Sequence, residues 1–239
     1  MTHHDHPGAV TQRAGATAAP LAVVTGRQAA ATSPTPVTAA GRIRRAVLVP
    51  RYDGDATSDW YPWLGRHLDD LGIRSTVVPL LPERTAPAVD QTVAAIAHAV
   101  GDDPDLCPHT LLIGHSVGSR ALLAYLDRRE AEAPFAGLVS VAGWFTVDDL
   151  DAFPVLVPWV ELELDRAGLA AKAGPITVHL SDNDLFTANW ADNAAEWLSP
   201  LGASVHVTSG AGHFMAPTAP PVLDTVRAAA RTSAATSIE

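Results

Sequence analysis

From residue 44 onward the chain alternates short apolar runs with stretches of helical periodicity. Six runs are rich in aliphatic and β-branched residues, and most are almost continuously apolar, which is typical of parallel strands covered on both faces. The predicted strands are Ala46–Val49, Ser75–Pro79, Thr110–Gly114, Gly137–Ala142, Ile176–Leu180 and Ser204–Val207. We expect them to form one buried sheet.

Amphipathic stretches occupy the intervals between these runs. Before the third run, apolar side chains recur at i, i+4, i+7 and i+11, which places them in one stripe along a helix: Val89, Val93, Ile96 and Val100. Further helices are predicted after Ser116, over 190–198 and around 222–226. Strand–helix alternation with short connections predicts the α/β class, with a doubly wound, mostly parallel sheet of about six strands flanked by helices.

Two segments depart from this rhythm. Residues 1–41 are dominated by Ala, Thr, Pro and Gly without a sustained period, and they are expected to form a flexible leader ahead of a single domain over 42–239. Residues 143–169 combine aromatic and acidic side chains between two predicted strands. An insertion at the carboxyl edge of a parallel sheet lies where substrates bind, so this segment is interpreted as a small cap or a pocket wall. An ordinary amphipathic connection packed on the core is the alternative.

Bulk composition limits the classes of function. Hydrophobic residues make up 47% and charged residues 18% of the 239 positions, which is typical of a globular domain. The formal net charge of −10 argues against a nucleic acid or an anionic membrane surface as partner, because phosphate binding needs a basic face. Cys107 is the only cysteine, and the start of the chain lacks a secretory signal pattern, so the cytoplasm is the expected compartment.

The strongest local motif follows the third predicted strand. There the chain has the pattern Gly-x-Ser-x-Gly, with Ser116 between Gly114 and Gly118, and a helix is predicted directly afterwards. This arrangement is typical of a nucleophile elbow, a tight strand-to-helix turn that lifts a serine hydroxyl above the sheet. The helix start directs free N–H groups at the reaction centre, so the Val117 amide is a candidate donor to an oxyanion.

A serine nucleophile needs a base, and the base needs an orienting acid. In this fold class they follow in the order Ser, acid, His, at the ends of later strands. His213 lies in a Gly-rich loop after the last predicted strand and is the candidate base. Asp182 and Asp184 both follow the preceding strand, and the usual spacing favours Asp184. The other carboxylate would then form a turn or cap a helix.

Other candidates surround this triad. The second oxyanion donor is expected in the loop after the first strand, from the backbone amide of Arg51 or Tyr52. The Arg51 side chain would pair with Asp53 or contact an acidic substrate group. Four side chains near the motifs are candidates for a substrate pocket: His115, Trp144, Phe145 and Phe214. His115 adjoins the nucleophile but should point away from it, to shape the pocket or to pack beneath the loop.

With these motifs assembled, the chain resembles the small serine hydrolases of the retinoblastoma-binding protein 9 family, within the α/β-hydrolase superfamily. The matching segments are Val47–Pro50 followed by Asp59–Leu64, then Gly114–Ser119, Ser181-x-x-Asp184 and Gly212–Phe214. The resemblance spans about residues 44 to 231 and implies an α/β-hydrolase fold with a small cap or none and a Ser–Asp–His triad. Arg51 and Leu185 stand where that family often has Gly and Pro.

The expected activity is hydrolysis of a carboxylic ester, thioester or amide through an acyl-enzyme on Ser116, with carboxylesterase chemistry favoured. The expected partner is a small-molecule acyl substrate, and neither a metal nor an organic cofactor is needed. Two alternatives use the same residues: an acyltransferase or cyclising thioesterase of a biosynthetic pathway, and a non-catalytic binding protein with a hydrolase-like fold. The sequence sets neither the substrate nor the oligomeric state.

Overall fold

The structure, a computed structural model, describes residues 43–130, 133–199 and 201–235, so the predicted leader over 1–41 lies outside it. Its main sheet has six strands in the order β2-β1-β5-β6-β7-β8, and every neighbouring pair is parallel. The strands are β1 (Arg45–Val49), β2 (Arg74–Val77), β5 (Thr110–His115), β6 (Gly137–Val141), β7 (Ile176–Ser181) and β8 (Ser204–Thr208). All six predicted strands are present. Only β2 ends clearly early, before Pro79, which has no N–H for the ladder.

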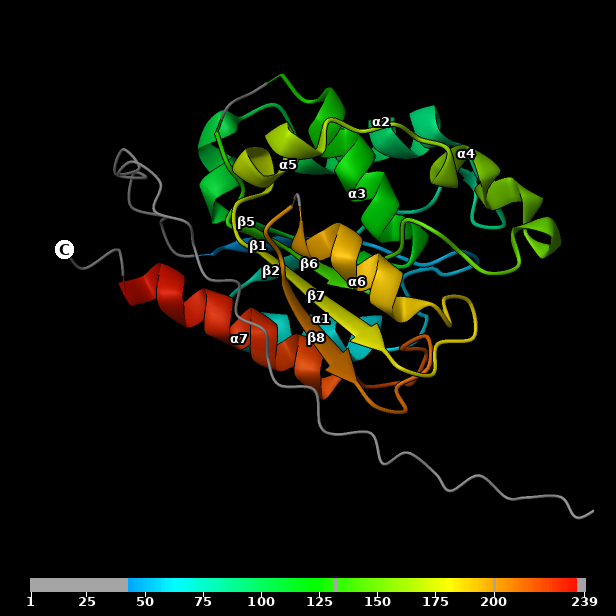
Figure 1. The fold of residues 1–239 in the computed structure, drawn as a ribbon. Coiled ribbons are helices and arrows are strands. Elements are labelled where there is room, and N and C mark those ends of the chain that lie inside the picture. The colour runs from blue at the N-terminus through cyan, green and yellow to red at the C-terminus, as the bar shows by residue number, and fades with distance from the viewer. Residues whose placement is uncertain (1–42, 131–132, 200, 236–239) are drawn as a thin grey trace, which may run out of the picture. The chain divides into compact units, whose positions relative to one another are not determined.

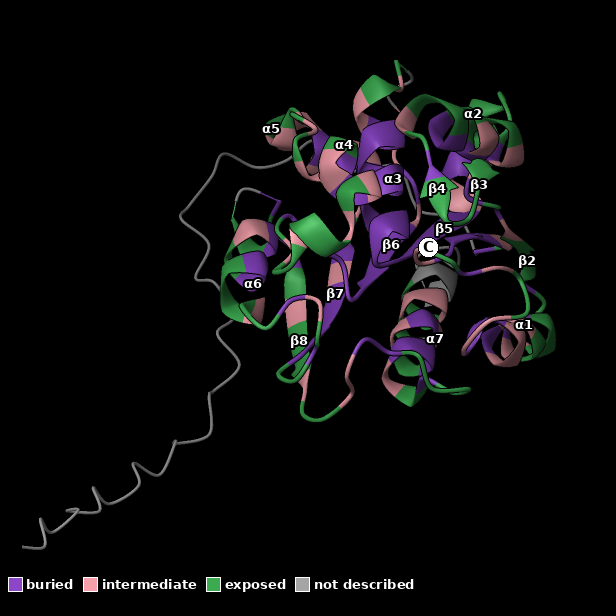
Figure 2. Cartoon of the chain, turned by 90° about the vertical axis from the view of Figure 1, so that its right-hand side faces the viewer, coloured by how far each residue is buried: buried purple, intermediate pink, exposed green. Residues whose placement is uncertain are grey.

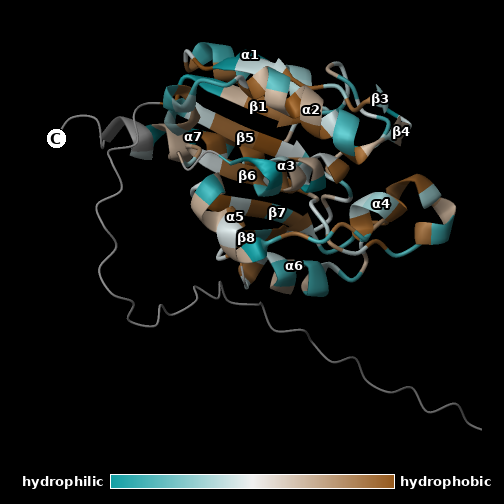
Figure 3. Ribbon diagram, turned by 90° about the horizontal axis from the view of Figure 1, so that it is seen from above, coloured by the Kyte–Doolittle hydropathy of each residue, from teal (hydrophilic) through white to brown (hydrophobic). Residues whose placement is uncertain are grey.

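Helices cover both faces of this sheet (Figure 1). One face carries α2 (Val89–Val100), α3 (Val117–Arg128), α5 (Arg166–Ala173) and α6 (Trp190–Leu198), and the other carries α1 (Tyr61–Asp70) and α7 (Pro220–Ala235). Each face has its own apolar core, and the central strands are the most hydrophobic part of the molecule (Figure 3). The predicted fold class, a doubly wound parallel sheet of six strands, is therefore confirmed.

The shorter elements lie in the connections. A small antiparallel hairpin joins β3 (Pro82–Glu83) to β4 (Ala86–Pro87), and the turn η1 (Pro104–His109) leads into β5. The segment 143–169 contains the turns η2 (Leu150–Ala152) and η3 (Pro154–Leu156), then the single-turn helix α4 (Val157–Val160) and the start of α5. These pieces are too short to show a hydrophobic period, so the sequence did not predict them. Among the described residues, no helix is both long and apolar enough to cross a membrane.

Helix α3 lies in the middle of the helical layer and is buried over most of its length (Figure 2). It even buries a charged side chain, Arg120, which donates hydrogen bonds to the carbonyl oxygens of Trp159 and Leu162. Burial lowers the pKa of Arg120 to about 10, and the neighbouring Arg166 acts in the same direction. The guanidinium therefore ties the segment after β6 to the helix that follows Ser116.

A neutral histidine is built into strand β7. The Nε2 atom of His179 lies 2.9 Å from the hydroxyl oxygen of Thr225, which itself donates to the Pro221 carbonyl. Nε2 therefore carries the hydrogen, and the bare Nδ1 atom is buried with no hydrogen-bond partner among the described residues. Burial, with a smaller contribution from His206, lowers the pKa of His179 to about 4.

We expect the free energy of unfolding to fall as the pH is lowered from 7 to 5. The unfolded chain protonates this ring near its ordinary pKa of 6.5, whereas the folded chain keeps it neutral down to about 4. Protons therefore favour the unfolded state in this window, by about 2 kcal/mol at pH 5. Urea unfolding at both pH values should show that a His179→Gln variant loses less stability than the wild type by this amount. Equal losses would contradict the assignment.

Candidate active site

The predicted elbow is present between β5 and α3. Ser116 is the residue before the first turn of α3. Its backbone has φ 55° and ψ −121°, a conformation that residues other than glycine rarely adopt. Its amide donates to the Val141 carbonyl at 2.8 Å, which fixes the turn against the end of β6. The residue is 5% exposed. Such strain is characteristic of functional turns that the surrounding structure holds in place.

The two flanking glycines are required by close backbone contacts. A Cβ atom on Gly114 would lie 2.6 Å from Cα of Ser119. A Cβ atom on Gly118 would lie only 2.1 Å from the Val49 carbonyl oxygen and 2.7 Å from that of Pro50. Gly118 therefore lets the loop after β1 approach the start of α3. This contact brings the two predicted sources of oxyanion donors to the same edge of the sheet.

We expect Gly118→Ala to destabilise the protein by about 3 kcal/mol or more, because backbone must move to relieve the clash. Gly65→Ala is the matched control. Gly65 lies within helix α1, and a Cβ atom there would meet only the Ser75 hydroxyl oxygen, at 3.6 Å. Alanine is the better helix former there, so the control should be neutral or stabilising. Urea unfolding checks both variants. A Gly118→Ala protein as stable as the control would refute the close approach.

His213 and Asp184 form a buried pair. The His213 Nδ1 atom lies 2.7 Å from Asp184 Oδ2, and the side chains are 6% and 2% exposed. The other carboxylate oxygen, Oδ1, accepts a hydrogen bond from the Phe186 amide at 2.9 Å. A carboxylate can only accept, so Nδ1 carries the hydrogen and Nε2 is left bare. This is the tautomer that a general base needs.

The neighbouring acid has a different contact. Asp182 Oδ1 accepts from the Gly210 amide, and the next side chain, Asn183, accepts from the Gly212 amide. The Gly210 hydrogen bond also lowers the pKa of Asp182. Successive residues of the β7–α6 loop thus hold the loop that carries His213, and Asp184 is the carboxylate that contacts the imidazole. Asp148, which follows β6, instead accepts from the Ala188 amide at 2.5 Å.

A chain of hydrogen bonds runs beneath these residues and passes through His115. The Arg51 amide donates to the Tyr61 hydroxyl oxygen at 3.1 Å, and that hydroxyl lies 2.7 Å from His115 Nδ1. His115 Nε2 lies 2.8 Å from the His213 carbonyl oxygen, which can only accept. Nε2 of His115 therefore carries the hydrogen, and Nδ1 accepts from Tyr61. Burial lowers the pKa of His115 well below its ordinary value and raises that of Tyr61.

This chain supports the backbone of the site. It connects the loop after β1, helix α1, the residue before Ser116 and the loop that carries His213. His115 is fully buried with both ring nitrogens engaged, so it packs beneath the loop, one of its two predicted positions. The ring centroids of His115 and His213 lie 5.4 Å apart. Within the described residues no direct hydrogen bond joins Ser116 to His213. Catalytic hydrogen bonds are often long before substrate binds and tighten in the complex.

The oxyanion candidates differ in their availability. The Arg51 amide is bonded to Tyr61, whereas the amides of Tyr52 and Val117 have no hydrogen-bond acceptor among the residues that the structure describes. The Arg51 side chain forms a two-pronged ion pair with Asp59, at 2.7 and 3.2 Å. The expected partner Asp53 was therefore wrong, because Asp53 lies at the loop tip and pairs with Arg84.

The aromatic pocket candidates have three different surroundings. The Trp144 indole donates to the Ser116 hydroxyl oxygen at 3.1 Å. Phe145 packs on Trp197 and beneath the Arg166 guanidinium in the core of the helical face around α3. Phe214 belongs to the core on the other face of the sheet. Trp144 is thus the aromatic candidate in contact with the nucleophile.

Sequence reasoning missed three residues that hold this site. They are Tyr61, Phe186 and Asn193. The Tyr61 hydroxyl accepts from the Arg51 amide, and the Phe186 amide donates to Asp184. The buried Asn193 side chain accepts hydrogen bonds from the amides of Phe145 and Thr146. Asn193 had a usable signal, since it is a polar residue beside the apolar face of α6, one turn before Trp197. Tyr61 and Phe186 act through contacts that no local pattern predicts.

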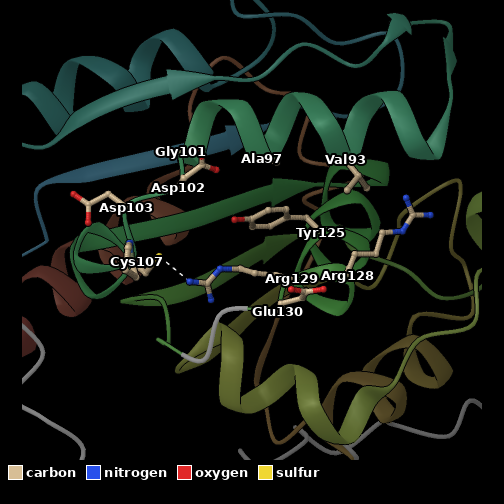
Figure 4. A pocket seen from close by; sticks show the side chains of 11 residues that line it. Val93, Ala97, Gly101, Asp102, Asp103, Cys107, Tyr125, Arg128, Arg129 and Glu130 are labelled. Carbon is tan, nitrogen blue, oxygen red and sulfur yellow. Dashed lines mark hydrogen bonds between the residues drawn. The ribbon is translucent and has the colours of Figure 1, made fainter.

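Two hollows in the described part of the chain have linings that do not include Ser116, Asp184 or His213. One, of about 370 Å³, lies beside the carboxyl end of α3, the end opposite to Ser116 (Figure 4). There the Arg129 guanidinium donates to the Cys107 sulfur at 3.1 Å, yet burial raises the pKa of that thiol. A raised pKa disfavours the thiolate, which is the reactive form of cysteine. No group of three or more His, Cys, Asp or Glu side chains in the described ranges is arranged to hold a metal ion.

Comparison with known proteins relates this geometry to others. The chain matches the family described as serine hydrolase over residues 46–219. The protein YdeN of Bacillus subtilis (strain 168), named as a hydrolase, is 20% identical over 176 residues, covering 72% of this chain and 86% of YdeN. The solved structure of the B. subtilis ydeN gene product has a TM-score of 0.68 at 19% identity, covering 78% of this chain and 98% of that one.

Two further structures share the fold. DcsB, solved in complex with its substrate analogue, has a TM-score of 0.60 at 12% identity, covering 82% of this chain and 92% of its own. Est1E from Butyrivibrio proteoclasticus has a TM-score of 0.52 at 11% identity, covering 83% and 90%. At these identities the likeness concerns the arrangement of the chain.

Proposed function

This chain belongs to the serine hydrolase family and has the α/β-hydrolase fold, and from that premise we propose that it cleaves a carboxylic ester, thioester or amide through an acyl-enzyme on Ser116. The observation that carries the proposal is the strained elbow conformation of Ser116 at the start of α3. The buried Asp184–His213 pair, with its bare Nε2 atom, supports it further. These features together are what nucleophilic catalysis by serine requires.

The reaction has two halves. His213 Nε2 takes the hydroxyl proton as Ser116 Oγ bonds to the carbonyl carbon, and the carbonyl electron pair moves onto its oxygen. The amides of Val117 and Tyr52 donate to that oxyanion. His213 then passes the proton to the departing alcohol, thiol or amine. Water repeats these steps on the acyl-enzyme and releases the free acid and Ser116.

The substrate is proposed to carry an apolar acyl group. Leu185, next to Asp184, is 88% exposed, and Met215, two residues after His213, is 49% exposed. Ligand sites are lined mainly by apolar side chains with a few polar groups, so these two side chains beside the catalytic pair support that class of substrate. Within the family, the Ser181-x-x-Asp184 loop and the tryptophan-rich start of α1 favour the retinoblastoma-binding protein 9 group.

Trapping the acyl-enzyme tests this function. Nitrophenyl acetate, butyrate and octanoate are mixed with the protein, and the reaction is quenched in acid. We expect nitrophenol release, an intact mass increased by one acyl group, and that group on the peptide containing Ser116. With competing amines or alcohols present, free acid should remain the product; transfer to them would favour an acyltransferase. An acyl group found only on another peptide, or turnover that survives Ser116→Ala, would refute the proposal, and no turnover with any ester would favour a binding protein.

A further inference from the structure

The indole of Trp144 makes an unusual hydrogen bond. Its side chain is buried, and Nε1 donates to the Ser116 hydroxyl oxygen at 3.1 Å. An indole N–H can only donate, so the serine oxygen is the acceptor. A hydroxyl that accepts through a lone pair still has its own proton to donate. Trp144 and a base on the other side can therefore contact the same oxygen at the same time.

Two other buried tryptophans satisfy their N–H groups with backbone, whereas the buried Nε1 atom of Trp60 has no hydrogen-bond partner among the described residues. Trp159 Nε1 donates to the Pro87 carbonyl at 2.9 Å, and Trp197 Nε1 donates to the Gly143 carbonyl at 3.0 Å. A backbone carbonyl is the common partner of a buried donor. Trp144 instead uses the hydroxyl on which the proposed chemistry depends.

The backbone that carries Trp144 is held rigidly and at some strain. Ala142 has φ 47°, a left-handed conformation that is unfavourable for a residue with a side chain. Gly143 has no room for one, because a Cβ atom there would lie 2.0 Å from the Ser140 hydroxyl oxygen. Beyond Trp144, the Asn193 amide oxygen accepts from the next two backbone amides, at 2.6 and 3.1 Å, and its NH2 group donates to the Thr146 carbonyl. The indole is therefore aimed before any substrate arrives.

We propose that Trp144 is a catalytic residue that donates a hydrogen bond to the nucleophile oxygen as that oxygen becomes negative; this inference rests on the proposed function. As the Ser116 proton moves to His213 Nε2, electron density builds on Oγ, and the Trp144 N–H···O bond strengthens into a charge-assisted one. The new bond from Oγ to the carbonyl carbon then moves the charge to the carbonyl oxygen, which the Val117 amide binds. The donor returns to a neutral hydrogen bond once the ester has formed.

The same donor acts in the second half of the reaction. When the tetrahedral intermediate collapses, Ser116 Oγ leaves the acyl carbon and takes a proton back from His213. A donor at Oγ stabilises that departing oxygen. Trp144 therefore accelerates acylation and deacylation without touching the acyl group, so its loss should lower the limiting rate and leave substrate binding unchanged.

The test is the rate at which a fluorophosphonate probe labels Ser116. In this reaction the Oγ–phosphorus bond forms, fluoride leaves, and the hydroxyl proton passes to His213. The probe concentration is varied to obtain a limiting rate and a half-saturating concentration for each variant. Trp144→Phe keeps an apolar ring and removes the N–H. We expect its limiting rate to fall about 10- to 100-fold, somewhat less than the loss of a full oxyanion donor, with the half-saturating concentration within about twofold.

The matched control is Trp159→Phe. Trp159 is also fully buried, and the substitution likewise removes an indole N–H and its one hydrogen bond, which goes to the Pro87 carbonyl and not to Ser116. We expect it to lower the unfolding midpoint but to keep the labelling rate within about twofold of the wild type. If Trp144→Phe does not fold, replacement of Trp144 by the benzothiophene analogue of tryptophan, which has the indole shape without the N–H, provides the same comparison.

The outcomes separate this inference from the function on which it rests. No adduct on Ser116 of the wild type would reject the proposed function itself. If the wild type is labelled on Ser116 but loss of the Trp144 N–H leaves the limiting rate equal to that of the control, the function stands and the catalytic role of Trp144 is overturned. A loss confined to the half-saturating concentration would likewise overturn it, since that result assigns Trp144 to ligand binding.

Discussion

Ser116→Ala is expected to lower the kcat for nitrophenyl ester hydrolysis by at least about 10⁴-fold, the largest effect of any substitution in this chain. Removing the oxygen removes the acyl-enzyme route entirely, because an alanine methyl group cannot bond to the carbonyl carbon. The fold should persist, since the Ser116 side chain is the hydrogen-bond partner of Trp144 alone among the described residues. Steady-state kinetics measures the loss of kcat, and circular dichroism checks that the fold persists.

Ser119→Ala is the control for this substitution. Ser119 is a buried serine on the same helix, and its hydroxyl pairs with that of Ser140 at 2.9 Å. The Ser119→Ala variant therefore loses a comparable hydroxyl and hydrogen bond, but no group that takes part in the proposed reaction. We expect its kcat to stay within a few-fold of the wild type. Full esterase activity in Ser116→Ala would show that Ser116 is not the nucleophile.

Asp184→Asn is expected to lower kcat by about 10³- to 10⁴-fold. The Phe186 amide already donates to Oδ1, so an asparagine would keep its oxygen there and turn its NH2 group toward His213 Nδ1. Nδ1 would then have to accept, and the hydrogen would move to Nε2, where it blocks proton removal from Ser116. The geometry would be kept while the base is lost. Kinetics on the purified variant at neutral pH checks this.

The companion substitution Asp182→Asn keeps an oxygen that can accept from the Gly210 amide. Its effect on kcat should be small, within about threefold, because this exposed side chain only supports the loop. The pair of variants therefore decides which carboxylate orients the imidazole. A larger loss in Asp182→Asn than in Asp184→Asn would exchange their roles.

Local patterns were sufficient for the sheet and for the elbow. Continuous apolar runs such as Thr110–Gly114 identify buried parallel strands, and the pattern around Ser116 identifies the turn because both glycines are required by nearby backbone. The spacing of Asp182 and Asp184 favoured the second, but only the contact with His213 separates them, since both follow the same strand.

Contacts between distant segments could not be predicted in this way. The ion pair of Arg51 with Asp59 and the hydrogen bonds of Tyr61 to two other elements depend on how the loop after β1 folds over α1. Trp144 was expected in a pocket on the strength of its position after a strand. Its hydrogen bond to Ser116 depends on the left-handed turn at Ala142, for which the sequence has no signal because alanine rarely adopts it.

A crystal structure of the protein after reaction with a small fluorophosphonate tests the central claim most directly. We expect phosphorus bonded to Ser116 Oγ, a phosphoryl oxygen within hydrogen-bond distance of the Val117 amide, and His213 Nε2 within about 3.2 Å of Oγ while Nδ1 still contacts Asp184. Phosphorus on another residue, or an adducted Ser116 whose oxygen His213 Nε2 cannot reach, would contradict it.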